Sequence, residues 1–444
     1  MILGHQMSKS TGFVILRRRI GEIFMEVVKF DKVNILHPGP PDTPSAADLV
    51  QRILAAQPWL RSMQGDAERQ QRVPQEVIER LDSAGIYSLA TPARFGGADF
   101  SSRDLFRIYI ALGSGCGATA WTLWASTGGN LWSEAFPEDV VKPIYDRPWV
   151  GNRTCAVGGS TRRLAGTGRK VDGGWMVRGK WAFATASAHA SHAYLAVFYD
   201  DHDDSKVGMV LVPRAQYIRL DDWDTIGLAA TGSATISIED ELFVPDVRFS
   251  SPEILMQRLA ERKLAGNGPR PGGLGRSIMV GTGNAVGMAE HALELFLGSI
   301  DKKPIAYSPY NRQKDAPITH INVGTVQMQI KAARCVAEAA LDDLDRLHEE
   351  GGLATPADIV RYHADGAFVW DTCATAVETL FKASGASGIA KKQPLQLVAR
   401  NVRAGSLHAA HNIQTCLENY GRQLCDVESN IVSASVLERA NVAI

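Results

Sequence analysis

The sequence predicts a multidomain α+β protein, with an N-terminal helical domain, a middle β-barrel or sandwich domain and a C-terminal four-helix bundle. From residue 45 onwards apolar residues recur at helical spacing. Near Gly151 the period changes to two, and short β-branched runs alternate with turn residues. After a Pro- and Gly-rich linker at 267–275, long helical patterns return. We expect a tail or extension at 1–44 and domains at 45–148, 149–265 and 266–444.

Three helices and a Trp-rich fourth are expected in the N-terminal domain. The first begins near Ser45, and the second begins with Pro74 in its first turn and ends at Gly85. Ser102 is expected to cap the third. The fourth, at 118–136, carries three tryptophans and should face the site if the domains pack as expected.

Five β-strands and four long helices follow. The strands are predicted at 166–171, 175–181, 193–199, 207–213 and 234–238. Asp172-Gly173-Gly174 predicts a hairpin between the first two, because both turn positions tolerate positive φ. Helices of such length indicate an antiparallel bundle, and they are predicted at 276–300, 318–349, 356–384 and 402–425.

The composition is that of an ordinary soluble globular protein. The chain has 444 residues, of which 45% are hydrophobic and 21% charged, and a formal net charge of -1. This charge provides no broad positive field for nucleic acid or an anionic membrane. The six cysteines form no CxxC, which indicates a reducing compartment. No stretch reaches the roughly 18 consecutive apolar residues of a membrane span. We expect a soluble, cytoplasmic protein.

Four segments carry a family resemblance, at 81–97, 179–190, 227–245 and 394–408. The second reads GKWAFATASAHA, similar to the oxygenase pattern G-x-W-x-F-[AS]-S-G-x-x-H-A. The fourth contains PLQ and then RNVRAGSLH, close to P-L-Q-R followed by R-D-x-R-A-x-x-x-H. From residue 45 to about 428 the chain resembles the acyl-CoA dehydrogenase fold. Within that fold it resembles the flavin-dependent monooxygenases that receive reduced flavin from a separate reductase.

The two branches of this family need different chemistry. A dehydrogenase needs a carboxylate beside the flavin as a general base. The register anchored at 412–414 places His408 or Ala409 where that Glu usually stands. Other members carry the base early in the first bundle helix, but no Asp or Glu occurs between Arg262 and Ala289. An FAD-dependent acyl-CoA dehydrogenase is therefore the first alternative, and a non-catalytic flavin-binding protein the second.

The resemblance implies a monooxygenase that uses reduced FMN or FAD and O2. It would hydroxylate an aromatic or heteroaromatic small molecule, or oxidise its heteroatom, through a C4a-hydroperoxyflavin. Such a species persists when water is excluded and flavin N5 is hydrogen-bonded. Thr185 takes the place of the family's Ser and is predicted to bond N5. His408 is predicted to bond the peroxide or orient a substrate hydroxyl.

Further site residues follow from the same resemblance. Trp223 and the turn Thr231-Gly232-Ser233 are predicted to contact the flavin, and Arg312 to meet an FMN phosphate. Gly129 stands where several phenol-hydroxylating relatives carry a His, which argues against a simple phenol substrate. No metal site is predicted, because the histidines lack a partner at ligand spacing. The predicted substrate pocket contains Trp121, Asn130, His189 and His411.

Partners are predicted as well. No Rossmann or Walker motif occurs, so reduced flavin is expected from a separate NAD(P)H:flavin reductase. The resemblance implies a homotetramer formed through the C-terminal bundle. No nucleic-acid or membrane partner is expected. The sequence does not choose between FMN and FAD, and it does not identify the small aromatic substrate.

Overall fold

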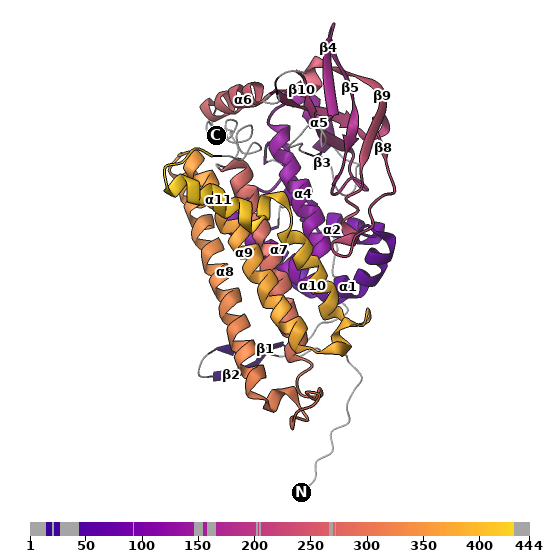
Figure 1. Ribbon diagram of the computed structural model, residues 1–444. Coiled ribbons are helices and arrows are strands. Elements are labelled where there is room, and N and C mark those ends of the chain that lie inside the picture. Colours follow the sequence, from indigo (N-terminus) through magenta and orange to yellow (C-terminus); the bar gives the residue numbers. More distant parts are fainter. Residues whose placement is uncertain are drawn as a thin grey trace.

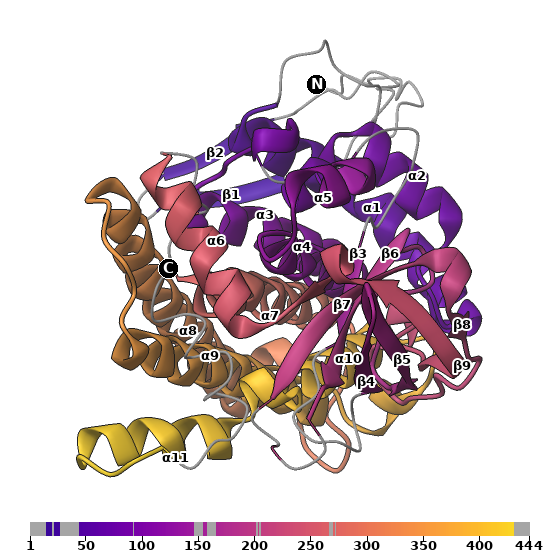
Figure 2. The same ribbon diagram turned by 90° about the horizontal axis from the view of Figure 1, so that it is seen from above.

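The computed structural model describes residues 15–19, 22–26, 44–91, 93–145, 154–157, 166–200, 203, 206–265, 270 and 272–429. Figure 1 shows the strands that follow residue 153 gathered at one end of the long helices, and Figure 2 shows the same arrangement from above. The predicted fold class, with helices, then strands, then a helical bundle, is confirmed. The domain boundaries remain a prediction. None of the helices in these ranges is long and apolar enough to cross a membrane.

The N-terminal helices form largely as predicted. Ser45 caps the first of them in a capping box with Asp48. The third is capped by Ser101, so the prediction of Ser102 was wrong. The backbone N–H of Ser102 instead donates to Asp345, 2.7 Å away. The elements are α1 (Ala46–Gln70), α2 (Gln75–Ser83), α3 (Ser102–Gly115), α4 (Gly117–Ser133) and α5 (Glu138–Tyr145), preceded by the paired strands β1 (Ile15–Arg19) and β2 (Glu22–Glu26).

Eight strands form one sheet in the order β10-β7-β6-β4-β5-β9-β8, with β3 parallel to β6. The predicted hairpin joins β4 and β5, and Gly173 takes the left-handed conformation, with φ 72°. Strand β3 was not predicted, because three of its four residues are buried and no alternation marks it. The strands are β3 (Thr154–Val157), β4 (Gly166–Val171), β5 (Gly174–Trp181), β6 (His192–Phe198), β7 (Val207–Pro213), β8 (Ile218–Arg219), β9 (Ile236–Pro245) and β10 (Phe249–Ser250).

The central strands are buried on both faces. Leu195 and Val210 belong to one apolar cluster, whereas their neighbours Tyr194 and Leu211 belong to another. The second cluster contains residues of α5 and of α6 (Pro252–Leu264), so these helices cover that face of the sheet. Helix α6 was not predicted either, although Ser251 caps it and a Pro occupies its first turn.

The C-terminal helices differ from the prediction at one place. The single helix expected at 402–425 is two helices, because the chain leaves the first at Ser406. After the short 3₁₀ helix η9 (Ala409–His411), the side chain of Asn412 accepts from two backbone N–H groups and starts the next helix. The elements are α7 (Gly273–Leu297), α8 (Pro317–Glu349), α9 (Pro356–Ala383), α10 (Pro394–Ser406) and α11 (Ile413–Leu424).

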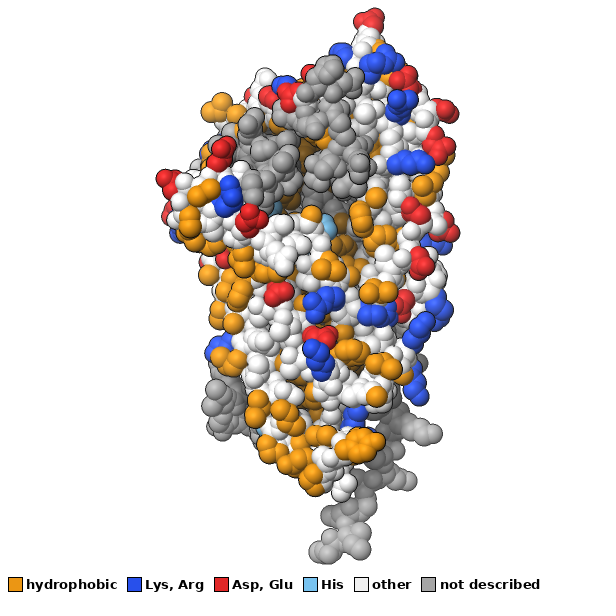
Figure 3. Space-filling view, in the orientation of Figure 1, with side chains coloured by type: hydrophobic (Ala, Val, Ile, Leu, Met, Phe, Trp, Pro, Cys, Tyr) orange, Lys and Arg blue, Asp and Glu red, His pale blue; other side chains and the backbone are white. Residues whose placement is uncertain are grey.

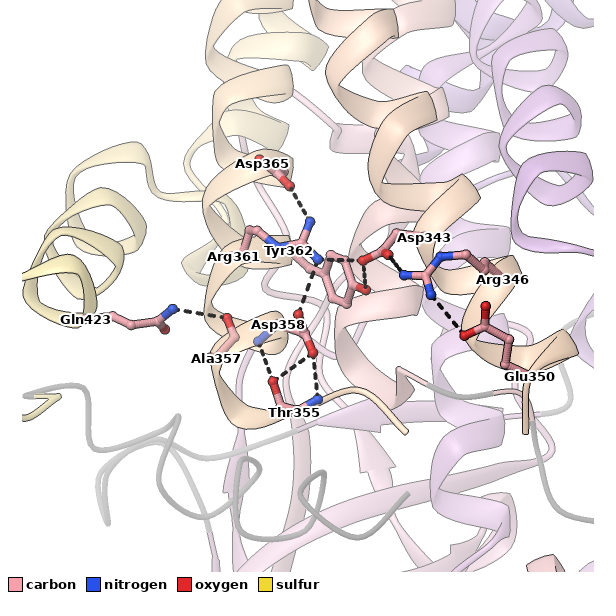
Figure 4. Close-up of polar contacts among 10 residues, drawn as sticks. All are labelled: Asp343, Arg346, Glu350, Thr355, Ala357, Asp358, Arg361, Tyr362, Asp365 and Gln423. Carbon is pink, nitrogen blue, oxygen red and sulfur yellow. Dashed lines mark hydrogen bonds and ion pairs between the residues drawn. The ribbon is translucent and has the colours of Figure 1, made fainter. Parts of the chain in front are cut away.

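A polar network joins α8, α9 and α11 at one end of the bundle (Figure 4). Arg361 Nη2 and Tyr362 OH of α9 both donate to Asp343 Oδ2 of α8, at 2.6 and 2.9 Å. Gln423 of α11 donates to the backbone oxygen of Ala357 at 3.4 Å. These bonds hold α8 against α9 and tie α11, the helix that follows η9, to α9.

Candidate functional site

A chain of three hydroxyls links two loops of the β-domain. The first loop joins β5 to β6 and contains Thr185, and the second joins β8 to β9 and contains Leu228, Thr231 and Ser233. Thr185 Oγ1 lies 2.6 Å from Ser233 Oγ, which lies 2.7 Å from Thr231 Oγ1. Thr231 donates to the backbone oxygen of Leu228 at 2.8 Å. A hydroxyl has one hydrogen, so Thr231 accepts from Ser233, and Ser233 in turn accepts from Thr185. The half-buried Thr185 oxygen therefore keeps its lone pairs free to accept a hydrogen bond from a bound molecule.

Both loops contain strained backbone. Phe183, Ala186 and Leu228 are not glycines, yet their φ angles are 62°, 70° and 52°. Such conformations cost of order 1–3 kcal/mol each and gather at functional sites. The Phe183 ring is 67% exposed and meets Trp223 edge-on, with 6.0 Å between centroids. The hydroxyl chain thus lies beside an exposed aromatic rim.

Helix α10 holds the second loop. Asn401 Oδ1 accepts the Leu228 N–H at 2.8 Å, and both residues are buried. Arg400 donates to the backbone oxygen of Ile226 and forms an ion pair with Glu68 of α1. The site prediction omitted both α10 residues, although the segment that carries the resemblance contains them. Their contacts show that this segment positions the loop.

An aromatic cluster joins α4, α9 and the α10–α11 turn. Trp121 lies 4.9 Å from Trp124, 5.5 Å from Trp370 and 5.4 Å from His408 between ring centroids. His411 stacks on Trp370 at 5.1 Å. Trp370 was missed as a site residue, because only the fold brings α4 and α9 together here, whereas Trp124 was one of the three tryptophans noted on the fourth helix and lies three positions after Trp121 on α4. The helix break at 407–412 places both histidines in this cluster.

His408 is the solvent-accessible member of the cluster. The protein around it nevertheless desolvates the ring and lowers its pKa to about 4. The ring Nδ1 accepts the Ala410 N–H at 3.2 Å. Since neutral imidazole has one acceptor and one donor nitrogen, Nε2 carries the hydrogen, and neutral His408 is a donor toward the open side.

His411 lies behind His408 and is buried. The pKa of His411 lies well below its usual range, mainly because the ring is buried and to a smaller extent because His408 is close. The backbone carbonyl of Gly405 acts in the opposite direction. Among the described residues, neither ring nitrogen has a hydrogen bond of good geometry. His411 is therefore a neutral, apolar-packed ring in this structure.

The other predicted residues lie elsewhere. His189 Nε2 bonds the backbone oxygen of Val73 at 2.8 Å, which ties the β-domain to the N-terminal helices. Arg312 forms a bidentate pair with Asp315, in the α7–α8 loop at the opposite end of the long helices from α11 (Figure 1). The side chain of Asn130 lies outside the described residues, although its backbone belongs to α4.

The two clusters are neighbours through one element. Asn401 of α10 binds the loop that ends the hydroxyl chain, and seven positions later His408 enters the aromatic cluster. Leu228 also belongs to the same buried apolar cluster as Trp121. An accessible hydroxyl acceptor and an accessible imidazole donor are thus attached to one rigid framework.

Comparisons with known proteins agree with this architecture. Models of the acyl-CoA dehydrogenase N-terminal domain and C-terminal domain match residues 46–135 and 280–413. The oxygenase subunit HsaA of a flavin-dependent monooxygenase from Rhodococcus jostii is 29% identical over 381 residues, which cover 84% of this chain and 97% of the relative. The oxygenase component of p-hydroxyphenylacetate 3-hydroxylase from Acinetobacter baumannii is 24% identical over 404 residues, or 88% of this chain and 92% of the relative.

Solved structures give the same result. XiaF from Streptomyces sp., in complex with FADH2 and glycerol, has a TM-score of 0.79 and 25% identity, and the match covers 87% of this chain and 97% of that chain. The resemblance inferred from the four segments is thereby confirmed. The chain is built from acyl-CoA dehydrogenase-like N- and C-terminal domains, and its homologues are the oxygenase components of flavin-dependent monooxygenases.

Proposed function

We propose that this protein is the oxygenase component of a two-component flavin-dependent monooxygenase. It takes reduced FMN or FAD from a separate NAD(P)H:flavin reductase. It then hydroxylates an aromatic or heteroaromatic small molecule, or oxidises its heteroatom. When bound, reduced flavin supplies the electrons that activate O2 for transfer of one oxygen atom. The observation that carries the proposal is the one-way hydroxyl chain that ends at Thr185.

The direction of the hydrogen bonds in the hydroxyl chain suits reduced flavin better than oxidised flavin. Reduced flavin carries a hydrogen on N5, whereas oxidised flavin presents a lone pair there. The Thr185 oxygen has given its hydrogen to Ser233, so it accepts from an N5–H and repels an unprotonated N5. Trp223 and Phe183 supply an apolar edge for the ring system. Thr231 and Ser233 act through Thr185, because their own hydrogens are already donated.

The aromatic cluster favours an aromatic substrate. Trp121 and Trp124 supply flat apolar surface, and a planar ring packs well on such surface. His408 supplies one neutral donor, suited to an oxygen or a heteroatom of the substrate or to activated oxygen. A resorcinol hydroxylase from Rhizobium and an indole-3-acetate monooxygenase from Acinetobacter baumannii are among the relatives, which supports this substrate class.

Dehydrogenation fits less well. The two carboxylates of α7 are engaged away from the aromatic cluster: Glu290 with Arg334 and Glu294 with Arg61. No described carboxylate shares an aromatic contact or a hydrogen bond with His408. An acyl thioester would therefore lack a base to remove its α-proton.

A homotetramer formed through the bundle is part of the proposal. Three large apolar side chains of α8 are exposed, Ile318 by 54%, Ile321 by 62% and Met328 by 60%. Figure 3 shows hydrophobic side chains gathered over the lower part of the bundle. Arg312, which is paired with Asp315 in this chain, is proposed to reach a flavin phosphate across such a subunit contact. Sedimentation of wild type and of Ile321→Glu tests this, and a monomeric wild type contradicts it.

Single-turnover oxidation tests the main proposal. The full chain is mixed anaerobically with FMNH2 or FADH2 and then with 18O-labelled O2 and a panel of indoles, phenols and thioethers. We expect labelled product, and a protein-dependent delay before oxidised flavin appears. Immediate flavin oxidation with every compound, and no label in any product, refutes the proposal. Reduction of bound FAD by an acyl-CoA without O2 would instead establish the dehydrogenase.

A further inference from the structure

A concavity lies away from the Thr185 and His408 clusters, between α5 and the sheet. Its volume is 450 Å³, within the range of small-molecule sites. Val140 of α5 and Leu211 of β7 form apolar walls. Phe243, near the end of β9, and Val247, in the turn just after it, add two more, although they are 47% and 54% exposed. Exposed apolar side chains around a hollow are typical of a binding site rather than of a plain surface.

Two charged residues line this groove, Arg248 and Asp139. Neither forms an ion pair in the described part of the chain, and the carboxylate nearest to Arg248 in sequence, Asp246, is bound to Lys170 at 2.7 Å. His192 also lines the groove. The pKa of His192 is lowered to about 4, mainly by burial of the ring and to a smaller extent by the positive charge of Arg248. His192 is therefore neutral near pH 7. Its Nδ1 is engaged with Ser191 Oγ at 2.9 Å.

We propose that this groove binds a small apolar carboxylate, such as an aryl carboxylate, as a ligand distinct from the oxygenase substrate. Its carboxylate pairs with the Arg248 guanidinium, whose fork suits two carboxylate oxygens. Its ring packs against Phe243, Val247 and Val140. Asp139 repels the carboxylate and thereby sets the orientation of the ligand. The inference does not rest on the oxygenase activity, because the groove shares no residue with that site.

Fluorine NMR of para-fluorobenzoate with the flavin-free full chain tests this inference. We expect Arg248→Met to weaken binding about tenfold or more, because a charge-assisted hydrogen-bond pair is lost. Asp139→Asn should strengthen binding roughly two- to fivefold, because a like charge is removed. The neutral para-fluorobenzamide should bind at least about tenfold more weakly than the acid.

Controls separate this site from others. Arg169→Met removes an exposed arginine of β4 that pairs with Glu241 outside the groove, and it should leave binding unchanged. Arg248→Gln, together with thermal melts, guards against a misfolded variant. Equal binding by wild type and both Arg248 variants refutes the inference, as does the absence of binding to wild type. Weaker binding by Asp139→Asn also overturns it, because removing a negative charge from the groove should favour an anionic ligand that pairs with Arg248.

Discussion

Replacing Asn401 by Leu should release the loop that carries Leu228. The Leu228 N–H donates to Asn401 Oδ1 at 2.8 Å, and each residue is only 5% exposed. Leu has nearly the shape of Asn but no acceptor, so the variant leaves a buried N–H unsatisfied. That costs about 1–3 kcal/mol, or about 5- to 150-fold in the equilibrium between the held and the released loop.

The loop has no easy way to find another acceptor. At Gly227 its backbone already touches α10, since a Cβ there would lie 2.2 Å from the Arg400 carbonyl oxygen. A small shift toward the helix is therefore blocked. Leu228 also holds a left-handed conformation, with φ 52°, which relaxes once the bond is lost. Both effects favour release over local repair.

Hydrogen exchange at the Leu228 amide is the direct assay. The rate should rise by about 5- to 150-fold in Asn401→Leu, and the dissociation constant for reduced flavin should rise by no more than that factor. Asn401→Asp is the matched control, because it keeps an acceptor and restores the Asp of the oxygenase pattern. Unchanged exchange at Leu228 in Asn401→Leu would refute the reasoning, whatever the flavin affinity.

Four further predictions concern the two clusters and α11. Thr185→Val should lower the product formed per flavin oxidised, while Thr185→Ser keeps the acceptor and most of the coupling; equal coupling in Val and Ser variants would remove the hydroxyl from the mechanism. The pKa of His408 in the folded protein is about 4, below the ordinary 6.5. As the pH falls from 6.5 toward 4, the unfolded chain binds a proton at His408 that the folded protein does not bind. The free energy of unfolding therefore falls over this range and is unaffected by titration of His408 above pH 6.5. Product formation should be flat from about pH 8 to about pH 6 and fall below about pH 5; a fall centred near 6.5 contradicts this. Gly405→Ala should destabilise the protein by about 1–3 kcal/mol in urea unfolding, because its Cβ would lie 2.3 Å from Trp370 Cζ3. Gly421→Ala, with nothing within 4 Å, should stabilise α11 by about 0.4–1 kcal/mol.

The sequence by itself determined the order of helices, strands and helices. The change of period near Gly151 depends only on residues close together in the chain, and it survives any packing of the domains. The same holds for the hairpin at Gly173 and for the segments around Thr185 and His408, whose patterns are local. The sequence also showed that neither position expected for the base carries a carboxylate, because this follows from the residue types alone.

Tertiary structure alone decided which groups these residues contact. The role of Thr185 as an acceptor depends on Ser233, 48 positions away, and on the hydrogen already donated by Thr231. The break before His411 arises because Asn412 caps a new helix, although the apolar period runs through it. Local periodicity records which face of an element is buried, but it does not record which distant side chain lies against that face. Hydrogen-bond direction and ring contacts depend on such distant pairs, so they can be read from the tertiary structure but not from the sequence.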